Sequence, residues 1–104
     1  MKKEIEKLLG AIVADYAKIT EDQERVEQFA NDLEVKEGKK YMKVIKGLGN
    51  QRCVWGFIVK EDGGKFMKGD ILKAAGWAAP ALNQARGNIF DEYNIAWTGP
   101  AYLR

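Results

Sequence analysis

The chain has 104 residues, of which 46% are hydrophobic and 31% are charged, and its 17 Lys and Arg exceed its 15 Asp and Glu by a formal net charge of +2. This balance excludes a largely disordered chain and predicts a single globular domain over residues 1–104, helical in residues 1–34 and β-rich in residues 35–104. The chain has no histidine and one cysteine, which excludes Ser-His-Asp and Cys-His catalysis and histidine-based metal sites. We therefore expect a protein that is not an enzyme and that needs no cofactor and no metal.

Charge is distributed unevenly along the chain. Residues 1–34 contain five basic and nine acidic residues, whereas residues 35–104 contain twelve and six. A basic half is typical of a protein with an anionic partner, but two halves of opposite charge also attract each other within one fold. The chain lacks a run of about 18 apolar residues, and its N-terminus carries acidic residues where a signal peptide has an apolar core. We expect no membrane contact and an intracellular protein.

The N-terminal segment has the periodicity of an amphipathic helix from Lys2 to Tyr16. Thr20 and Gln23 then have the spacing of a capping box. A second apolar stripe follows, formed by Val26, Phe29, Ala30 and Leu33. Two interpretations stay open: the chain bends near Thr20, or one long helix continues to about Asn31.

The first apolar stripe has two alternative roles. It either packs on the sheet of its own chain or pairs with a second copy to form a homodimer. The candidate self-association residues are Ile5, Leu9, Ile12 and Tyr16.

Strand-like alternation replaces the helical period after Leu33. A turn at Glu37-Gly38 and a strand over residues 40–46 predict a hairpin. Residues 52–60, RCVWGFIVK, predict the principal strand. Its alternation places one set of side chains on one face and the other set on the opposite face: Cys53, Trp55, Phe57 and Val59 against Val54, Gly56 and Ile58. A strand that is apolar on both faces needs cover on both faces, which favours helices packed on the sheet.

The C-terminal part predicts short elements separated by turns. The glycines at 63 and 64 predict a turn, and residues 71–73 and 95–97 predict short strands. Pro80 and Gly87 bracket a short predicted helix near residues 80–86. The expected fold is α+β, with an N-terminal amphipathic helix or bent helix pair packed on a small, mostly antiparallel β-sheet.

The first candidate binding surface is basic. Lysines with exposed rings on a sheet hold single-stranded nucleic acid through phosphate contacts and base stacking. Alternation along the strands also allows most of these rings to be core. The candidate nucleic-acid-binding residues are Lys40, Lys43, Lys46, Arg52 and Lys60.

A second candidate site lies after the short predicted helix. Arg86 and Asn88 flank a glycine, and forked hydrogen bonds from such a pair bind phosphate or carboxylate groups. Arg86 has the alternative of capping its own helix or pairing with Asp91. Trp77, an indole among small residues, is a third candidate, because tryptophan often anchors a partner. Trp77, Arg86 and Asn88 are therefore the candidate residues for binding an anion or a partner.

A string of motifs from Lys40 to Arg104 carries a resemblance: YMKVIKG, GFIVK, KGDILKAAGWAAPA, ARGNIFD and WTGPAYLR. In this order they resemble a family of small bacteriophage proteins whose function is uncharacterised. That family typically has ASWKAP around the tryptophan, whereas this chain lacks the serine and the lysine beside Trp77. The resemblance implies a phage genome and hence the cytoplasm of a host bacterium, and it implies no activity.

Three functions remain open from the sequence. The leading hypothesis is a non-catalytic protein that contacts nucleic acid, or a complex that processes nucleic acid, through its basic C-terminal half. The first alternative is a protein-interaction module, either an inhibitor of a host protein or a minor virion component, that self-associates through its N-terminal helix. The second alternative is a protein that binds a small anionic nucleotide at Arg86 and Asn88.

Overall fold

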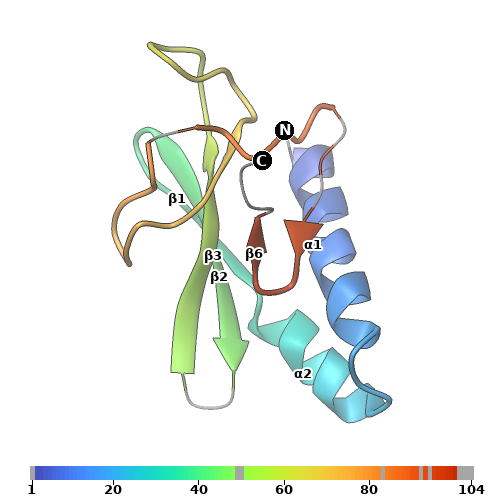
Figure 1. Cartoon of the computed structure of the whole chain (residues 1–104). Coiled ribbons are helices and arrows are strands. Elements are labelled where there is room, and N and C mark those ends of the chain that lie inside the picture. The colour runs from blue at the N-terminus through green and yellow to red at the C-terminus, as the bar shows by residue number, and fades with distance from the viewer. Residues whose placement is uncertain (1, 49–50, 83, 92, 94, 101–104) are drawn as a thin grey trace.

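The computed structural model describes residues 2–48, 51–82, 84–91, 93 and 95–100. Figure 1 shows the arrangement of the secondary-structure elements along these residues. They are α1 (Lys2–Ala17), α2 (Gln23–Asp32), β1 (Glu34–Glu37), β2 (Tyr41–Leu48), β3 (Gln51–Val59), β4 (Ile71–Leu72), β5 (Ile95–Ala96) and β6 (Gly99–Pro100). The α+β fold predicted from the sequence is confirmed, with the bent helix pair in place of one long helix.

The bend between the helices depends on Asp22. Its side chain accepts hydrogen bonds from the backbone N–H groups of Glu24 and Arg25, at 3.0 and 3.4 Å, and so caps the first turn of α2. The predicted capping box at Thr20 is wrong, because the Thr20 hydroxyl instead accepts from the Asp22 N–H at 3.2 Å. A short carboxylate side chain directly before the helix satisfies two of the N–H groups that have no intrahelical partner.

Within the described residues, β1 to β4 form an antiparallel sheet in that order. A β-bulge interrupts the pairing of β2 with β3, because Val44 pairs with Gly56 while Ile45 pairs with Val54. Trp55 is the extra residue, and beyond it the side chains of β3 exchange faces. The predicted sorting of β3 is therefore wrong: Trp55 packs with Ile58 in the main core, whereas Phe57 and Val59 belong to a second cluster.

The outer edge of β4 is covered by the segment where a short helix was expected. The Ala81 N–H donates to the Lys73 carbonyl and the Arg86 N–H to the Ile71 carbonyl, both at 2.7 Å, and the Ile71 N–H donates to Gly87. None of the described residues in 80–86 is helical. The predicted helix is wrong because these N–H groups bond across to β4 instead of to carbonyls one turn back.

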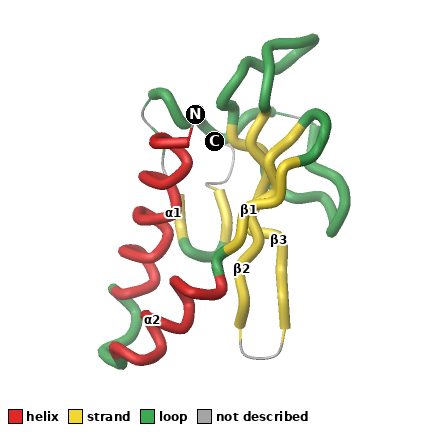
Figure 2. Tube along the Cα trace, turned by 180° about the vertical axis from the view of Figure 1, so that it is seen from behind, coloured by secondary structure: helices red, strands yellow, loops and turns green. Residues whose placement is uncertain are grey.

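The helices and the β5–β6 hairpin lie on the same side of the sheet. β5 contacts α1 and β6 contacts β3, so the hairpin lies between the first helix and the sheet, as Figures 1 and 2 both show. The Trp55 indole Nε1–H donates to the Ala96 carbonyl at 2.8 Å, and the Trp97 N–H donates to Asp15 Oδ2 at 2.8 Å. These bonds join residues 41 and 82 positions apart, so the first attaches the β5–β6 hairpin to the sheet and the second attaches it to α1.

The apolar stripe of α1 is core. Ile5 is 5% exposed and Ile12 is 0% exposed, and Leu9 packs against the same cluster. Tyr16 stacks on Phe29 with ring centroids 4.2 Å apart. The predicted self-association stripe of Ile5, Leu9, Ile12 and Tyr16 is therefore directed at the chain's own sheet and hairpin, which removes it as a docking surface for a second copy. No helix among the described residues has the length and apolar character needed to cross a bilayer.

Candidate functional site

The face of the sheet turned away from α1 is covered by loops instead of helices. In Figures 1 and 2 the segment that follows β4 runs on the opposite side of the sheet from the helices. Beneath it, Phe57, Val59 and Leu72 form a small buried cluster, against which Tyr41 and Phe66 pack with part of their surface exposed. The loops therefore cover this cluster only in part.

Two adjoining cavities open on this face. The first, of about 440 Å³, lies between the β1–β2 turn and the turn at residues 61–66, and Phe66 lines it. The second, of about 310 Å³, extends along the sheet and is lined by Lys36, Lys43 and Phe57. Both cavities share Lys39, Lys40 and Tyr41. We call the residues around them the lysine–aromatic surface: Lys36, Lys39, Lys40, Tyr41, Lys43, Phe57 and Phe66.

Strand register explains why lysines and rings gather here. Tyr41 and Lys43 are two residues apart on β2, so they share a face of the sheet. Lys43 pairs with Phe57 of β3, and the Tyr41 ring meets the Phe57 ring edge-on, with centroids 6.0 Å apart and planes at 73°. The rings thus form the floor, and the lysines of the turn and of β2 surround it.

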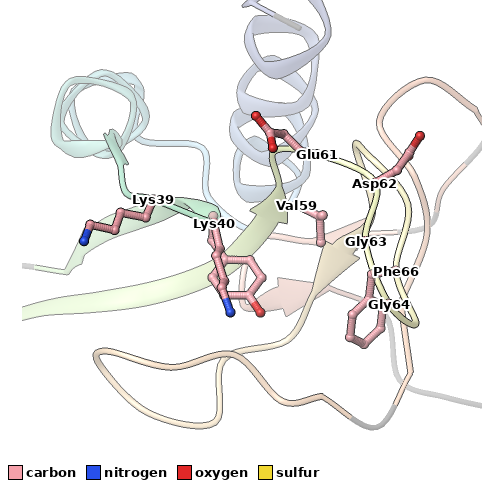
Figure 3. A pocket seen from close by; sticks show the side chains of 9 residues that line it. Lys39, Lys40, Val59, Glu61, Asp62, Gly63, Gly64 and Phe66 are labelled. Carbon is pink, nitrogen blue, oxygen red and sulfur yellow. The ribbon is translucent and has the colours of Figure 1, made fainter.

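The carboxylates near the lysine–aromatic surface have other contacts or directions. Glu37 pairs with Lys60 at 3.2 Å, and Asp62 accepts a hydrogen bond from the Lys68 N–H at 2.7 Å. Glu61 and Asp62 line the first cavity, yet their side chains extend in the opposite direction from those of Lys40 and Phe66 in Figure 3. The side of the turn that carries the rings is therefore predominantly positive.

Trp77 stands next to the second cavity. Its neighbour Ala78 lines that cavity, and the Lys43 Nζ lies 4.4 Å from the centroid of the Trp77 ring. An ammonium at this distance from an indole face makes a cation–π contact. Trp77 thus lies with Lys43 at the end of the lysine–aromatic surface.

Lys40 and Lys43 are the predicted nucleic-acid-binding residues that line the cavities. Lys46 lies on the other face of the sheet, where it is 6% exposed and donates to the carbonyls of Trp97 and Thr98 at 3.3 and 3.0 Å. Burial lowers the pKa of Lys46 below its ordinary value. Its prediction as a phosphate ligand is wrong, because its ammonium group is buried and already donates to two backbone carbonyls.

The two other predicted basic residues have protein partners. Arg52 pairs with Glu34. The Lys60 ammonium donates to the Gly38 carbonyl at 2.9 Å, in addition to its contact with Glu37. Neither lines the two cavities. Lys60 lies beside the lysine–aromatic surface at the β1–β2 turn, whereas Arg52 pairs with Gly47 toward the other end of the β2–β3 hairpin.

The predicted group of Trp77, Arg86 and Asn88 is not assembled as one site. Asn88 donates to the Lys68 carbonyl at 2.9 Å and to Asp70 Oδ1 at 3.0 Å, and its side-chain oxygen accepts from the Phe90 N–H. Its hydrogen bonds therefore join two loops. Arg86 lies along the edge of β4, where its Nε donates to the Gln84 carbonyl at 3.4 Å. Trp77 contacts Lys43 instead.

Some residues of the surface were not among the sequence-predicted site residues. Lys36, Lys39 and Tyr41 line the cavities. The alternation of Tyr41 and Lys43 was the available signal, since it places both side chains on the face that Lys46 cannot reach. Lys36 lies on β1 and could not have been assigned without the register of the sheet.

The described residues contain no cluster of three or more His, Cys, Asp or Glu side chains that could hold a metal ion. Cys53 is a half-buried free thiol. In the described part of the chain, every buried side-chain nitrogen or oxygen has a hydrogen-bond partner. What the geometry offers is a positively charged, ring-lined depression on one face of an antiparallel sheet.

This combination defines a small α+β protein with a basic and aromatic sheet surface opposite its helices. The chain belongs to the family of unknown function DUF7717, whose model matches residues 1–100. The match includes both helices as well as the sheet. Comparison with curated proteins and with solved structures found no match.

Proposed function

We propose that this chain is a non-catalytic protein that binds nucleic acid through the lysine–aromatic surface. The observation that supports the proposal is the pair of adjoining cavities that share Lys39, Lys40 and Tyr41. Lysines bind phosphates without regard to sequence, and partly exposed rings offer their faces or edges to bases. In keeping with the phage resemblance, we propose that the protein works in the cytoplasm of an infected bacterium, on nucleic acid alone or on a complex that processes it.

The combination of half-buried rings with exposed lysines supports the proposal of a binding surface. Tyr41 and Phe66 are half-buried, which fixes their positions, and Lys39 and Lys40 are exposed at the turn between β1 and β2. The turn itself is fixed, because the Gly38 N–H donates to the Tyr41 carbonyl at 2.8 Å and the Lys60 N–H donates to the Lys40 carbonyl at 3.0 Å. Because the rings are already ordered before a ligand binds, binding costs less conformational entropy.

The test is direct binding to labelled oligonucleotides at low and at physiological salt, followed by fluorescence anisotropy. The double variant Lys40→Gln, Lys43→Gln is expected to weaken binding and to reduce the slope of log affinity against log salt by about 1.5, because two phosphate contacts are lost. The matched control is Lys3→Gln, Lys7→Gln, which removes equal charge from exposed positions on α1. Thermal unfolding of both variants verifies that the fold is intact.

Two outcomes would contradict the proposal. If the purified protein binds no oligonucleotide at either salt concentration, the lysines serve solubility. If both double variants lose affinity equally, binding follows net charge, and the lysine–aromatic surface has no special role.

A further inference from the structure

Trp77 lies in a loop with a defined backbone. Ala74 and Pro80 form a bridge, and the N–H groups of Ala75 and Gly76 donate to the Ala79 carbonyl at 3.0 and 3.1 Å. The loop is anchored to the sheet by the bond from Ala81 to Lys73. These hydrogen bonds fix the backbone that carries the indole, and Trp77 is 51% exposed.

The three tryptophans of the chain have different surroundings. Trp55 is 1% exposed and hydrogen-bonded in the core, and Trp97 makes edge-on contacts with the rings of Tyr16 and Phe29. Trp77 has neither kind of contact among the described residues, and its one ring interaction is with the Lys43 ammonium. Burying its exposed apolar surface against a ligand would be favourable, because a large ring gains free energy when it leaves water.

The position of Lys43 decides which ligand fits. Lys43 lies against the Trp77 ring and lines the same cavity as Lys36, Lys39 and Lys40. A ligand on the indole therefore continues into a row of positive charges. A planar base attached to phosphates matches this arrangement, whereas an apolar peptide would leave the ammonium groups without counter-charges.

We infer that Trp77 is a stacking platform for one unpaired base, and that the surface it borders therefore prefers single-stranded over double-stranded nucleic acid. This inference rests on the proposed function. Bases in a duplex are stacked on one another and present only edges in the grooves, so an indole on a loop reaches the face of a base only in a single strand. Lys43 holds the neighbouring phosphate and places the indole through its cation–π contact.

The experiment compares a fluorescein-labelled single-stranded thymine oligonucleotide with a duplex of the same length. Trp77→Ala is expected to weaken single-strand binding by about 5- to 100-fold, and Trp77→Phe to restore most of it. Trp77→Leu, which keeps apolar area but has no π-face, should resemble Trp77→Ala. The matched control is Phe90→Leu, because Phe90 is 50% exposed in another loop.

The salt dependence separates stacking from charge. Trp77→Ala is expected to lower affinity without changing the slope of log affinity against log salt, whereas Lys43→Gln changes that slope. Tryptophan fluorescence is a second measurement: the oligonucleotide should quench the wild-type signal but not that of Trp77→Phe, in which Trp55 and Trp97 remain. Because the fluorescence measurement compares the wild type with Trp77→Phe, it remains informative even if Trp77→Ala does not fold.

The results distinguish this inference from the proposed function. Unchanged single-strand affinity in Trp77→Ala, or absence of Trp77 quenching, combined with lost affinity in the Lys40 and Lys43 double variant, overturns the stacking role and leaves the proposed function standing. Equal affinity for duplex and single strand likewise overturns the inference. No binding by the wild-type protein overturns both.

Discussion

The two faces of the sheet are built from the same strands but differ in cover. On the helix side, Val44, Ile58 and Trp55 are closed off by α1, α2 and the β5–β6 hairpin. On the loop side, a smaller buried cluster supports half-exposed rings among lysines. The difference teaches that the helix side holds the larger core, so we expect substitutions there to affect stability most, whereas substitutions of exposed residues on the loop side should affect mainly the proposed binding.

The largest effect is expected from breaking the helix-covered face. Ile12→Glu removes side-chain packing whose loss alone costs about 2–5 kcal/mol on truncation to alanine, and it places a carboxylate at a position that is fully buried. A chain of this size has about 5–15 kcal/mol of stability, so we expect the cooperative thermal transition to disappear in circular dichroism.

The control for this experiment is Ala14→Glu, which adds the same charge at an exposed position of α1. It should change the free energy of unfolding by about 0.5 kcal/mol or less. A folded Ile12→Glu chain would contradict the core role of this position. A wild-type dimer that Ile12→Glu dissociates without unfolding would return the stripe to a self-association role.

An intermediate effect is expected from loosening the two loops that Asn88 joins beside β4. Asn88→Ala removes two donated bonds and the acceptor of the Phe90 N–H, and we expect a loss of about 1–3 kcal/mol in urea unfolding. Gln84→Ala, an exposed position on the same segment, serves as the control and should have little effect. An anionic nucleotide that raises the melting temperature of the wild type but not of Asn88→Ala would instead support an anion site there.

A smaller, pH-dependent effect is expected from Lys46. Burial lowers its folded-state pKa below the ordinary value of 10.5, so at pH values between the two the unfolded chain binds more protons than the folded chain. Stability therefore rises as pH increases through that window, because the penalty is full below the folded-state pKa and has disappeared above the unfolded-state pKa of 10.5. Relative to Lys46→Met, the wild type should gain stability as pH rises from the folded-state pKa toward 10.5.

Urea unfolding at several pH values measures this difference. Comparing two variants cancels the contribution of Tyr93, whose pKa burial raises. Lys7→Met, at an exposed position of α1, should show no such trend. A difference between wild type and Lys46→Met that stays constant with pH would mean that Lys46 titrates as it does in the unfolded chain.

The smallest effect is expected at Arg52. Its ion pair with Glu34 joins two side chains that are about half exposed, and such pairs contribute about 0–1 kcal/mol. Arg52→Gln should therefore leave both urea unfolding and oligonucleotide affinity close to those of the wild type. A loss of affinity as large as that of Lys43→Gln would extend the binding surface onto β3.

Much of the fold could be predicted because the local hydrophobic periodicity of the sequence indicates its helices and strands. The spacing identified two helical stripes but left open whether a bend separates them, and the alternation after Leu33 identified the hairpin. The faces of β3 could not be predicted, since an inserted residue at Trp55 reverses the alternation without changing composition. The bracket of Pro80 and Gly87 suggested a helix, but pairing with β4 determined the conformation of that segment.

The candidate site was predicted only in part. Lys40, Lys43 and Trp77 lie at the cavities or border them. Lys46 lies on the opposite face of the sheet, because it is an odd number of residues from Lys43 along β2. Asn88 has a side chain that suits an anion, but its partners Lys68 and Asp70 come from another loop. Local patterns in a single sequence do not indicate which distant residues will form such hydrogen bonds.

The contact between Asp15 and Trp97 also has a consequence for synthesis. Domains generally fold in the order in which they leave the ribosome, and α1 leaves it first. Its cover, however, includes β5, which contacts it, and Trp97, whose N–H donates to Asp15 from 82 positions away. Until those residues emerge, the nascent chain carries an incompletely covered apolar helix, so completion of the core is a late event that follows formation of the local β2–β3 hairpin.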